Sequence, residues 1–450
     1  MSRTFSLLLF ALFFLSVSAN AQFRRIITFA GSGGTGGYAG DGLSATGALF
    51  HGPEAISLDK AGNTYIVDFY NARVRKIKTT GQIVNFAGTG VIGHAGDGSA
   101  STSAQLDPQG VAADWRGNVF ISDPIYNIIR KVNTLGIIST YAGNPTAGYA
   151  YTGDGGPATA AKLAAPTGMI CDKKSSLYFA DGANNVIRKI DSFGTITTVA
   201  GVGTAGYSGD GLMATDAELD SPYAVAVDKF GDLFIADYKN NVIRMVDAVT
   251  GLISTYAGTG TVGYAGDGAP AVAASLNYPT GVAVDTALNI YISDSYNNVI
   301  RMVDASGTIS TVAGNGSAGF GGDLGDPLGA NLFHPYGIAV DTFGSIFIAD
   351  ANNQRIRKVY FTTVGVDDVA LNQALIVFPN PVADKITIAN LRQAEKACIY
   401  DLTGRAVTPM LQAAKDGDQE IAVNTLSKGV YLLQVWDADG NKKGIVKLIK

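Results

Sequence analysis

The chain has 450 residues and a formal net charge of −5, from 33 Lys and Arg against 38 Asp and Glu. This balance, with no basic stripe along the chain, argues against a nucleic-acid partner. The chain holds 56 Gly and 14 Pro, but strong helix formers such as Glu are scarce, which favours an extracellular all-β protein. Its two cysteines, Cys171 and Cys398, lie far apart. We therefore expect a large β core, and not a disulfide framework, to supply stability.

The first 21 residues have the composition of a signal peptide. Arg3 supplies a basic start, residues 5–17 are apolar, and Ala19 and Ala21 provide small residues at the cleavage positions. The apolar run is short for a membrane span, and no later segment is long and apolar enough. We expect a secreted mature chain without a transmembrane segment; an uncleaved anchor is the alternative.

One sequence unit recurs six times. In every copy an Asp closes the second apolar run and an Arg follows seven residues later, with 55 to 58 residues between successive copies. The Asp residues are Asp68, Asp123, Asp181, Asp237, Asp294 and Asp350, and the Arg residues are Arg75, Arg130, Arg188, Arg244, Arg301 and Arg357. Each unit holds four short runs rich in Val, Ile, Tyr and Thr, bounded by Gly, Asp or Asn, which is typical of four strands. A fixed period of this length predicts a six-bladed β-propeller.

The two ends of the repeat array have complementary defects. Residues 26–31 match the fourth run of a unit, but no first three runs precede them. The sixth unit lacks a clear fourth run after Val359. We therefore expect the N-terminal strand to complete the last blade, which removes two open sheet edges. Blade one is predicted at 54–59, 64–68, 73–77 and 83–87, and blade six at 336–341, 346–349, 355–359 and 25–30.

The motifs of the unit resemble the NHL repeat. They read Pro-x-Gly-Val-Ala-Val-Asp, then Gly-Asn-x-Tyr-Ile-x-Asp, then Asn-x-Ile-Arg-Lys-Val, and they cover residues 23 to about 361. The resemblance implies the propeller fold. NHL propellers include protein-binding and RNA-binding platforms, sensor domains of bacterial receptors and a few metal-dependent lyases, so the resemblance leaves function open.

The tail after the repeats predicts a small β-sandwich of alternating strands and turns. Phe378-Pro379-Asn380-Pro381 and Gly429-Val430-Tyr431-Leu432-Leu433 resemble the C-terminal sorting domain of the type IX secretion system of Bacteroidetes-type bacteria. The resemblance implies export across the outer membrane by that machinery, followed by release or surface attachment; an ordinary immunoglobulin-like module is the alternative. The predicted domains are a signal peptide (1–21), a propeller (22–362), a linker (363–374) and a sorting domain (375–450).

Three recurrent loop features have structural explanations. Gly-x-Gly-x-x-Gly runs such as the one at Gly31 precede Pro-led strands and not a helix, so we do not expect a nucleotide site. The Asp-x-x-Asn turns and Asp-Gly loops lack EF-hand spacing. Their carboxylates are expected to bind backbone or a nearby Arg, with Ca²⁺ as the alternative. The aromatic residue before each Asp-Gly is expected to wedge between blades, and a carbohydrate platform is the alternative.

One constellation could hold a metal. His51 and His334 each precede a strand-opening Pro, and Asp107 and Asp220 hold comparable positions. All four are expected at the mouth of the central channel, where a transition metal such as Zn²⁺ could bind. Known metal-dependent NHL lyases use channel-facing His in a related way, but a third such His is missing. A metal-dependent lyase or lactone hydrolase is therefore the alternative function, and loop histidines without a ligand role are the plainer explanation.

The leading hypothesis is a monomeric binding or adhesion propeller for a protein, peptide or carbohydrate. Positions that are the same in all six blades are best explained by packing, so specificity should lie where the copies differ on the loop-rich face. These variable positions follow the second-strand Asp or the strand-opening Pro and often carry Tyr, which suits recognition. The predicted binding residues are Glu54, Phe69, Tyr70, Gln109, Tyr126, Tyr223, Tyr238, Lys239, Tyr296 and Tyr336.

Overall fold

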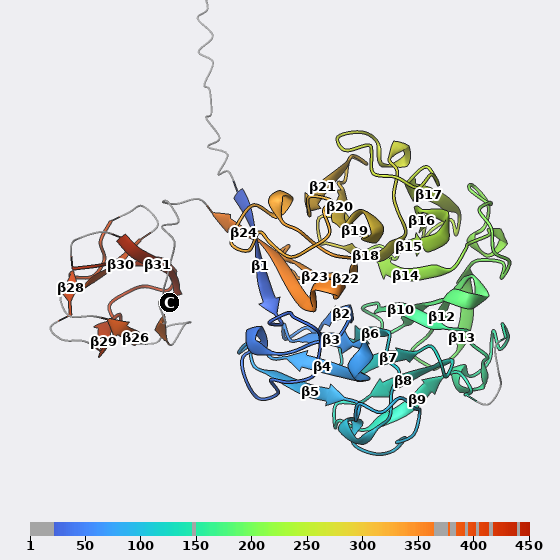
Figure 1. Cartoon of the computed structure of the whole chain (residues 1–450), viewed down its shortest axis with the longest axis horizontal. Coiled ribbons are helices and arrows are strands. Elements are labelled where there is room, and N and C mark those ends of the chain that lie inside the picture. The colour runs from blue at the N-terminus through green and yellow to red at the C-terminus, as the bar shows by residue number, and fades with distance from the viewer. Residues whose placement is uncertain are drawn as a thin grey trace, which may run out of the picture. The chain divides into compact units, whose positions relative to one another are not determined.

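The computed structural model describes residues 22–145, 150–363, 377–378, 384–391, 395–401, 405–413, 417–438 and 442–450. The chain divides into two compact units, residues 1–363 and residues 364–450 (Figure 1). The proposed signal peptide and residues 364–374 of the proposed linker lie outside the described residues. Among the helices of the described part, none is long and apolar enough to cross a membrane.

The first unit is a propeller of six four-stranded antiparallel sheets, as predicted. Blade 1 is β2 (Pro53–Leu58), β3 (Thr64–Asp68), β4 (Arg73–Ile77) and β5 (Ile83–Ala87); blade 2 is β6 (Gly110–Ala113), β7 (Val119–Asp123), β8 (Ile128–Val132) and β9 (Ile138–Ala142); blade 3 is β10 (Pro166–Cys171), β11 (Leu177–Asp181), β12 (Val186–Ile190) and β13 (Ile196–Ala200). Blade 4 is β14 (Pro222–Val227), β15 (Leu233–Asp237), β16 (Val242–Val246) and β17 (Ile253–Ala257); blade 5 is β18 (Pro279–Val284), β19 (Ile290–Asp294), β20 (Val299–Val303) and β21 (Ile309–Ala313); blade 6 is β22 (Pro335–Val340), β23 (Ile346–Asp350), β24 (Arg355–Thr363) and β1 (Gln22–Ala30).

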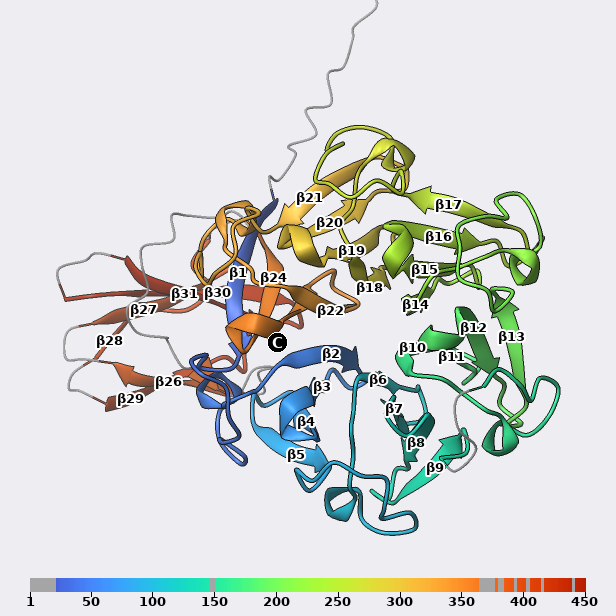
Figure 2. The same ribbon diagram turned by 45° about the vertical axis from the view of Figure 1, so that its right-hand side comes forward.

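The N-terminal strand closes the ring, which confirms the prediction from the complementary defects. Strand β1 pairs antiparallel with β24, from Gln22 opposite Thr363 to Thr28 opposite Arg357 (Figure 1 and Figure 2). Ile26 and Ala30 of β1 have no exposed surface and belong to the cores on the two sides of blade 6. Both strands are longer than predicted, because their ends continue to pair with each other.

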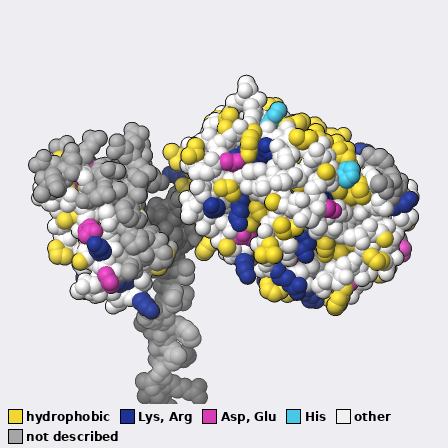
Figure 3. Space-filling model, turned by 90° about the horizontal axis from the view of Figure 1, so that it is seen from below, with side chains coloured by type: hydrophobic (Ala, Val, Ile, Leu, Met, Phe, Trp, Pro, Cys, Tyr) yellow, Lys and Arg dark blue, Asp and Glu magenta, His cyan; other side chains and the backbone are white. Residues whose placement is uncertain are grey.

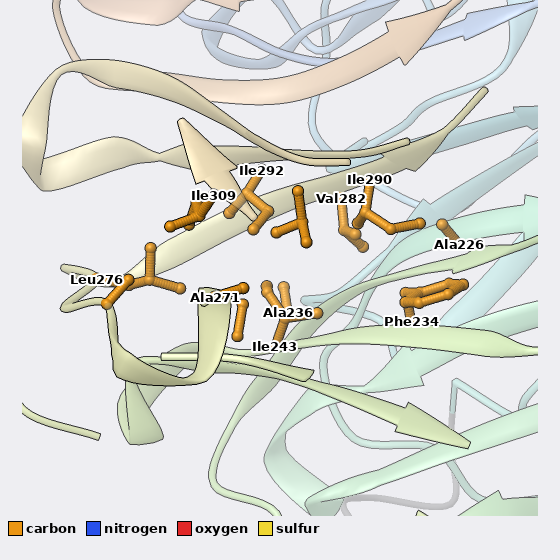
Figure 4. Packing of buried hydrophobic residues seen from close by; sticks show 13 residues of the cluster. Ala226, Phe234, Ala236, Ile243, Ala271, Leu276, Val282, Ile290, Ile292 and Ile309 are labelled. Atoms are coloured by element: carbon orange, nitrogen blue, oxygen red, sulfur yellow. The ribbon is translucent and has the colours of Figure 1, made fainter. Parts of the chain in front are cut away.

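The hydrophobic core lies between neighbouring blades. In the cluster of Figure 4, Phe234 and Ile243 of blade 4 pack with Val282, Ile290 and Ile309 of blade 5. The buried positions come from both faces of each sheet, since each blade has a neighbour on either side. This explains why the strands are continuous apolar runs with little polar alternation.

A buried arginine ties each blade to its own Asp-Gly loop. None of the six repeat arginines has exposed side-chain surface. Arg75 pairs with Asp68 at the end of β3 (3.3 Å) and with Asp41 in the preceding loop (2.7 Å). The same two pairs recur in blades 3 to 6, as predicted for the second-strand Asp. The loop carboxylates considered above for Ca²⁺ therefore have a guanidinium partner.

In blades 3 to 5 the aromatic residue before the Asp-Gly covers the arginine of its own blade, and the rings of Tyr151 and Tyr207 also lie near Gly203 and Gly260 in the loop before the next blade. Tyr151, Tyr207 and Tyr264 lie 5.2–5.3 Å over the arginines of blades 3, 4 and 5. Their hydroxyls share hydrogen bonds of 2.7–2.8 Å with Thr residues of the outermost strands. Each ring therefore covers an arginine that is already paired with carboxylates, and the aromatic side chain itself remains exposed at the surface.

The second unit is a two-sheet sandwich, which confirms the predicted fold class. One sheet has the order β25-β26-β29 and the other β28-β27-β30-β31. The strands are β25 (Val377–Phe378), β26 (Lys385–Leu391), β27 (Lys396–Tyr400), β28 (Leu411–Gln412), β29 (Gly417–Ala422), β30 (Val430–Trp436) and β31 (Lys442–Ile449). Ile386, Ile399, Leu433 and Val435 are among the buried residues of its core.

The surface carries no basic stripe on the side shown in Figure 3. There, Lys and Arg side chains (dark blue) are spread among hydrophobic ones (yellow) and a few Asp and Glu (magenta).

Deletion of residues 22–30 tests ring closure. Loss of buried Ile26 alone should cost about 2–5 kcal/mol, and the deletion also exposes the edge of β24. We expect a melting temperature lower by about 5 °C or more, or aggregation, in calorimetry and light scattering. The matched control begins at residue 22. Equal melting temperatures for the chains beginning at 22 and at 31 would refute closure by β1.

Candidate functional site

The loop-rich face is shaped by the turns between the second and third strands of the blades. In blade 4 the turn is a 3-10 helix at Tyr238–Asn240, which follows Asp237. Asn240 Nδ2 donates to Asp237 Oδ2 at 2.9 Å. The same bond recurs in blades 1, 3, 5 and 6. The bond fixes each of these five turns, and the second residue after the Asp is exposed in all of them.

The residue after each turn links one blade to the next. Asn241 is left-handed (φ 55°), and its Oδ1 accepts the backbone N–H of Tyr278 at 2.9 Å. Asn298 holds His334 in the same way at 3.0 Å. Tyr278 and His334 are themselves left-handed, with φ of 50° and 46°. This strained conformation is held by the inter-blade bond and sets both rings on the face of the propeller.

Six side chains of blades 4 to 6 form what we call the aromatic arc. Neighbouring ring centroids lie 4.7–6.1 Å apart, which is the range of favourable aromatic pairs. Its members are Tyr223, Tyr238, Tyr278, Tyr296, His334 and Tyr336. Tyr296 is 43% exposed, and the others are half-buried. The arc thus offers ring faces and hydroxyls to solvent.

A cavity of about 280 Å³ occupies the central channel and is lined by the innermost strands of all six blades. Its wall is mainly apolar, with Ile56, Met169 and Ile338 among the lining residues. Glu54, Gln109 and Tyr223 are polar members of the lining. Gln109 Nε2 donates to the Tyr223 hydroxyl at 2.9 Å, across the channel from blade 2 to blade 4. Tyr223 therefore belongs to both the cavity and the arc.

The glycine of the Pro-x-Gly motif brings the inner strands close together. A Cβ on Gly337 of blade 6 would lie 2.4 Å from the carbonyl oxygen of Glu54 in blade 1. Only glycine tolerates this approach. It sets Tyr336 and Glu54, the residues next to this contact, on neighbouring strands at the channel.

Glu54 is an unusual carboxyl group. Burial raises its pKa to about 7, the nearby Asp107 carboxylate raises it as well, and a hydrogen bond with Gln109 opposes the shift. Glu54 Oε2 is buried without a hydrogen-bond partner. Burial and the charge of Glu54 also raise the pKa of the Tyr336 hydroxyl to about 12. Among the groups that shift the pKa of Glu54, Gln109 alone favours its ionised form, and none of them is a cation.

Two carboxyl groups of blade 2, Asp107 and Asp123, lie close to each other, and the turn of this blade departs from the repeat. Tyr126 stands where the other turns carry the Asn that donates to the Asp. As a result Asp123 Oδ1 is buried without a partner, and burial raises the pKa of Asp123 to about 8, against about 6 for Asp181 in blade 3. The Asp107 backbone N–H donates to Asp123 Oδ2 at 3.3 Å.

The structure brings together six of the ten predicted binding residues: Glu54, Gln109, Tyr223, Tyr238, Tyr296 and Tyr336. Phe69 and Tyr70 form a separate aromatic group with His51 on blade 1, and Tyr126 stacks on His94 of blade 2. Lys239 makes an exposed ion pair with Asp220 at 3.6 Å. Sequence reasoning missed Tyr278 and the arc position of His334. The sequence signal that could have found both residues is the position before the strand-opening Pro, which varies among blades.

The four proposed metal ligands do not assemble. The His51 backbone N–H donates to Asp68 of its own blade. The His334 backbone N–H donates instead to Asn298 of the preceding blade, and in blade 1 the residue that makes this inter-blade bond is Gly52. The histidines are therefore one position out of register, and each ring stacks on a tyrosine. Within the described ranges, no group of three or more His, Cys, Asp or Glu side chains could hold a metal ion.

Comparisons with known proteins support both units. Residues 376–450 match the model of the secretion system C-terminal sorting domain. Residues 144–206 and 260–321 match the model of the teneurin NHL domain. The sorting domain indicates export to the cell exterior or surface by the type IX secretion system.

Two relatives of known sequence are much longer proteins. The chain is 27% identical over 340 residues to SUPPRESSOR OF QUENCHING 1 of Arabidopsis thaliana, covering 73% of this chain and 31% of that protein. It is 28% identical over 352 residues to teneurin-4 of Mus musculus, covering 70% of this chain and 12% of that protein. The chain thus spans less than a third of these relatives.

Solved structures share the propeller fold. A protein of unknown function from Bacteroides thetaiotaomicron has a TM-score of 0.56 at 18% identity and covers 76% of each chain. An auxiliary nutrient binding protein from Bacteroides ovatus has a TM-score of 0.55 at 15% identity, covering 76% of this chain and 77% of that one. At these identities the likeness shows the fold alone.

Substitution Glu54→Gln tests the electrostatics of the channel mouth. The folded pKa of about 7 lies above the ordinary value of 4.5. Protonated Glu54 therefore favours folding below about pH 4.5, and this contribution is lost as the pH rises through 7. We expect Glu54→Gln to be about 1–3 kcal/mol more stable relative to wild type at pH 8 than at pH 5, in urea unfolding. Glu218→Gln, the other propeller glutamate, should show no such difference. A pH-independent effect of Glu54→Gln would contradict the assignment.

Proposed function

We propose that this NHL-repeat propeller, which carries a C-terminal sorting domain of the type IX secretion system, is a binding module of the bacterial cell exterior. Its binding site is the aromatic arc together with the mouth of the central cavity. The observation that supports this most directly is the arc itself, in which five tyrosines and one histidine from three blades lie ring to ring, with Tyr223 also lining the central cavity.

The composition of the arc suits recognition. Tyrosine presents a large, rigid apolar area with a polar tip, and so it binds at small cost in conformational entropy. The arc is also preformed, because the Asn241 and Asn298 bonds hold Tyr278 and His334 in place. A rigid recognition surface loses little freedom on binding. The ligand classes consistent with such a surface are a peptide, a protein segment or a carbohydrate.

The arc is restricted to one side of the ring, as a site for one asymmetric ligand requires. Blades 4, 5 and 6 contribute all six members. The matching turn of blade 3 carries Gly182 and Ala183 after its Asp. Propellers of this fold include proteins named auxiliary nutrient binding proteins, which is compatible with a binding role here.

The lyase or lactone hydrolase alternative depended on a metal held by His51, His334, Asp107 and Asp220. Those residues are divided among separate contacts: ring stacking, backbone hydrogen bonds and an ion pair with Lys239. Binding is therefore the function that the described residues support best.

Alanine substitutions in the arc test the proposal. Labelled mature chain is applied to glycan and peptide arrays, and affinities for the hits are measured by calorimetry. We expect Tyr238→Ala, Tyr278→Ala and Tyr296→Ala each to weaken binding by about 1–2 kcal/mol without unfolding the protein.

Exposed aromatics at the opposite ends of the strands provide the control. Phe193 and Phe343 lie in turns between other strands and are 92% and 87% exposed. Phe193→Ala and Phe343→Ala should leave affinity unchanged. Full affinity in the triple arc variant would place the site elsewhere on the molecule.

A further inference from the structure

We infer that the mouth of the central channel takes the cationic ammonium group of a ligand, a primary or quaternary amine, with Glu54 as counter-ion and tyrosine rings as the surrounding wall. This inference names the ligand chemistry of the proposed binding site and so rests on the proposed function. It is carried by the position of Glu54, by the groups that face it and by the aromatic residues around it.

Glu54 lacks a cationic partner in the described structure. The groups that interact with it are Gln109, the Asp107 carboxylate, and the neutral phenols of Tyr223 and Tyr336. Its Oε2 atom is buried and accepts no hydrogen bond. A buried carboxylate without a partner is costly, whereas one that receives an ammonium group is stabilised.

The cations of the neighbouring elements are already paired. Arg75 binds Asp68 and Asp41, and Arg130 binds Asp97 at 2.5 Å. Lys239, on the turn beside Tyr238, binds Asp220. These three cations are therefore engaged elsewhere, and a ligand is the natural source of the positive charge that Glu54 lacks in the described structure.

Further carboxyl groups add to the negative potential. Asp107 interacts with both Glu54 and Asp123. Asp123 is fully buried, and its Oδ1 accepts no hydrogen bond. Arg130 offsets only part of this charge, because its short contact goes to Asp97. The channel mouth is thus acidic on the side of blades 1 and 2 and aromatic on the side of blades 4 to 6.

Tyrosine rings suit an ammonium group. A cation over an aromatic face gains about 0.5–2 kcal/mol. Tyr223 joins the cavity to the arc, with ring centroids of Tyr238 and Tyr336 at 5.8 and 6.1 Å. Tyr223 and Tyr336 both interact with Glu54. An ammonium group at the mouth would meet ring faces and a carboxylate together, while a neutral sugar would leave the Glu54 charge uncompensated.

Two pairs of probes isolate charge from shape. Choline is compared with its neutral carbon analogue 3,3-dimethylbutan-1-ol, and n-pentylammonium with pentan-1-ol, by calorimetric or NMR titration of the folded mature chain. We expect each cation to bind at least about tenfold more tightly than its neutral analogue. Glu54→Gln should abolish this preference, and Glu218→Gln should retain it.

The pH dependence gives a second readout. Ionisation of Glu54 creates the counter-ion, while the amines stay charged, so choline affinity should rise between pH 6 and pH 8. Asp107, Asp123, Arg130, Tyr223 and Tyr336 also face this region, and burial raises the pKa of the two other carboxyl groups among them, Asp107 and Asp123. Asp107→Asn and Asp123→Asn separate their contributions, because each should leave the rise intact while Glu54→Gln removes it.

The outcomes separate this inference from the proposed function. Equal binding of cations and neutral analogues, or a preference that survives Glu54→Gln, would overturn the ammonium site. The proposed function would still hold if array ligands lost affinity in the arc variants. Displacement of choline by Ca²⁺ at millimolar concentration would also overturn the ammonium site, because the mouth would then be a metal-cation site. Circular dichroism of Glu54→Gln confirms that a loss of binding is not a loss of folding.

Discussion

The propeller depends on an arginine that is buried in each blade and, in five of the six blades, pairs with two carboxylates. The guanidinium joins the end of the second strand to the long loop before the first strand, so a single side chain fixes both the blade and its loop. A buried ion pair contributes little net stability, but loss of one partner leaves an uncompensated charge and costs several kcal/mol. The geometry of the loop-rich face is thus specified by charge pairing, and the hydrophobic core between blades supplies the bulk stability.

Blade 2 shows what happens when this pattern is relaxed. Ala72 replaces the Asn or Gln that links other blades to their neighbours, and Pro108 offers no backbone N–H to receive such a link. Tyr126 replaces the Asn that satisfies the second-strand Asp. The loss of this Asn leaves Asp123 with an unpaired buried oxygen, while its other oxygen accepts the Asp107 backbone N–H. The departures of one repeat from the others thus coincide with the acidic side of the candidate site.

The fold could be predicted from the sequence because it follows from a period and from two matching defects. Six Asp–Arg spacings fix the blades, and the missing fourth strand fixes the role of residues 22–30. The candidate site was only partly predictable. Glu54 and Tyr223 were found from the variable position after the strand-opening Pro, but the pairing of Tyr278 with Tyr238 depends on a backbone bond between blades. The metal hypothesis failed because His51 and His334 differ by one position relative to the strand-opening Pro, an offset that the sequence shows as His51-Gly52-Pro53 against His334-Pro335.

Ring closure by β1 also sets the order in which the molecule can be completed. The strand that begins at Gln22 pairs with residues as distant as Thr363. During synthesis the first strand must therefore wait, unpaired, until nearly all of the propeller has been made. Contacts of such long sequence separation form slowly and leave apolar edges open meanwhile. A chain that stops before β24 has no partner strand for β1 and cannot close the ring. A truncated chain therefore keeps open sheet edges, whereas a chain that has reached Thr363 can close before the C-terminal unit is made.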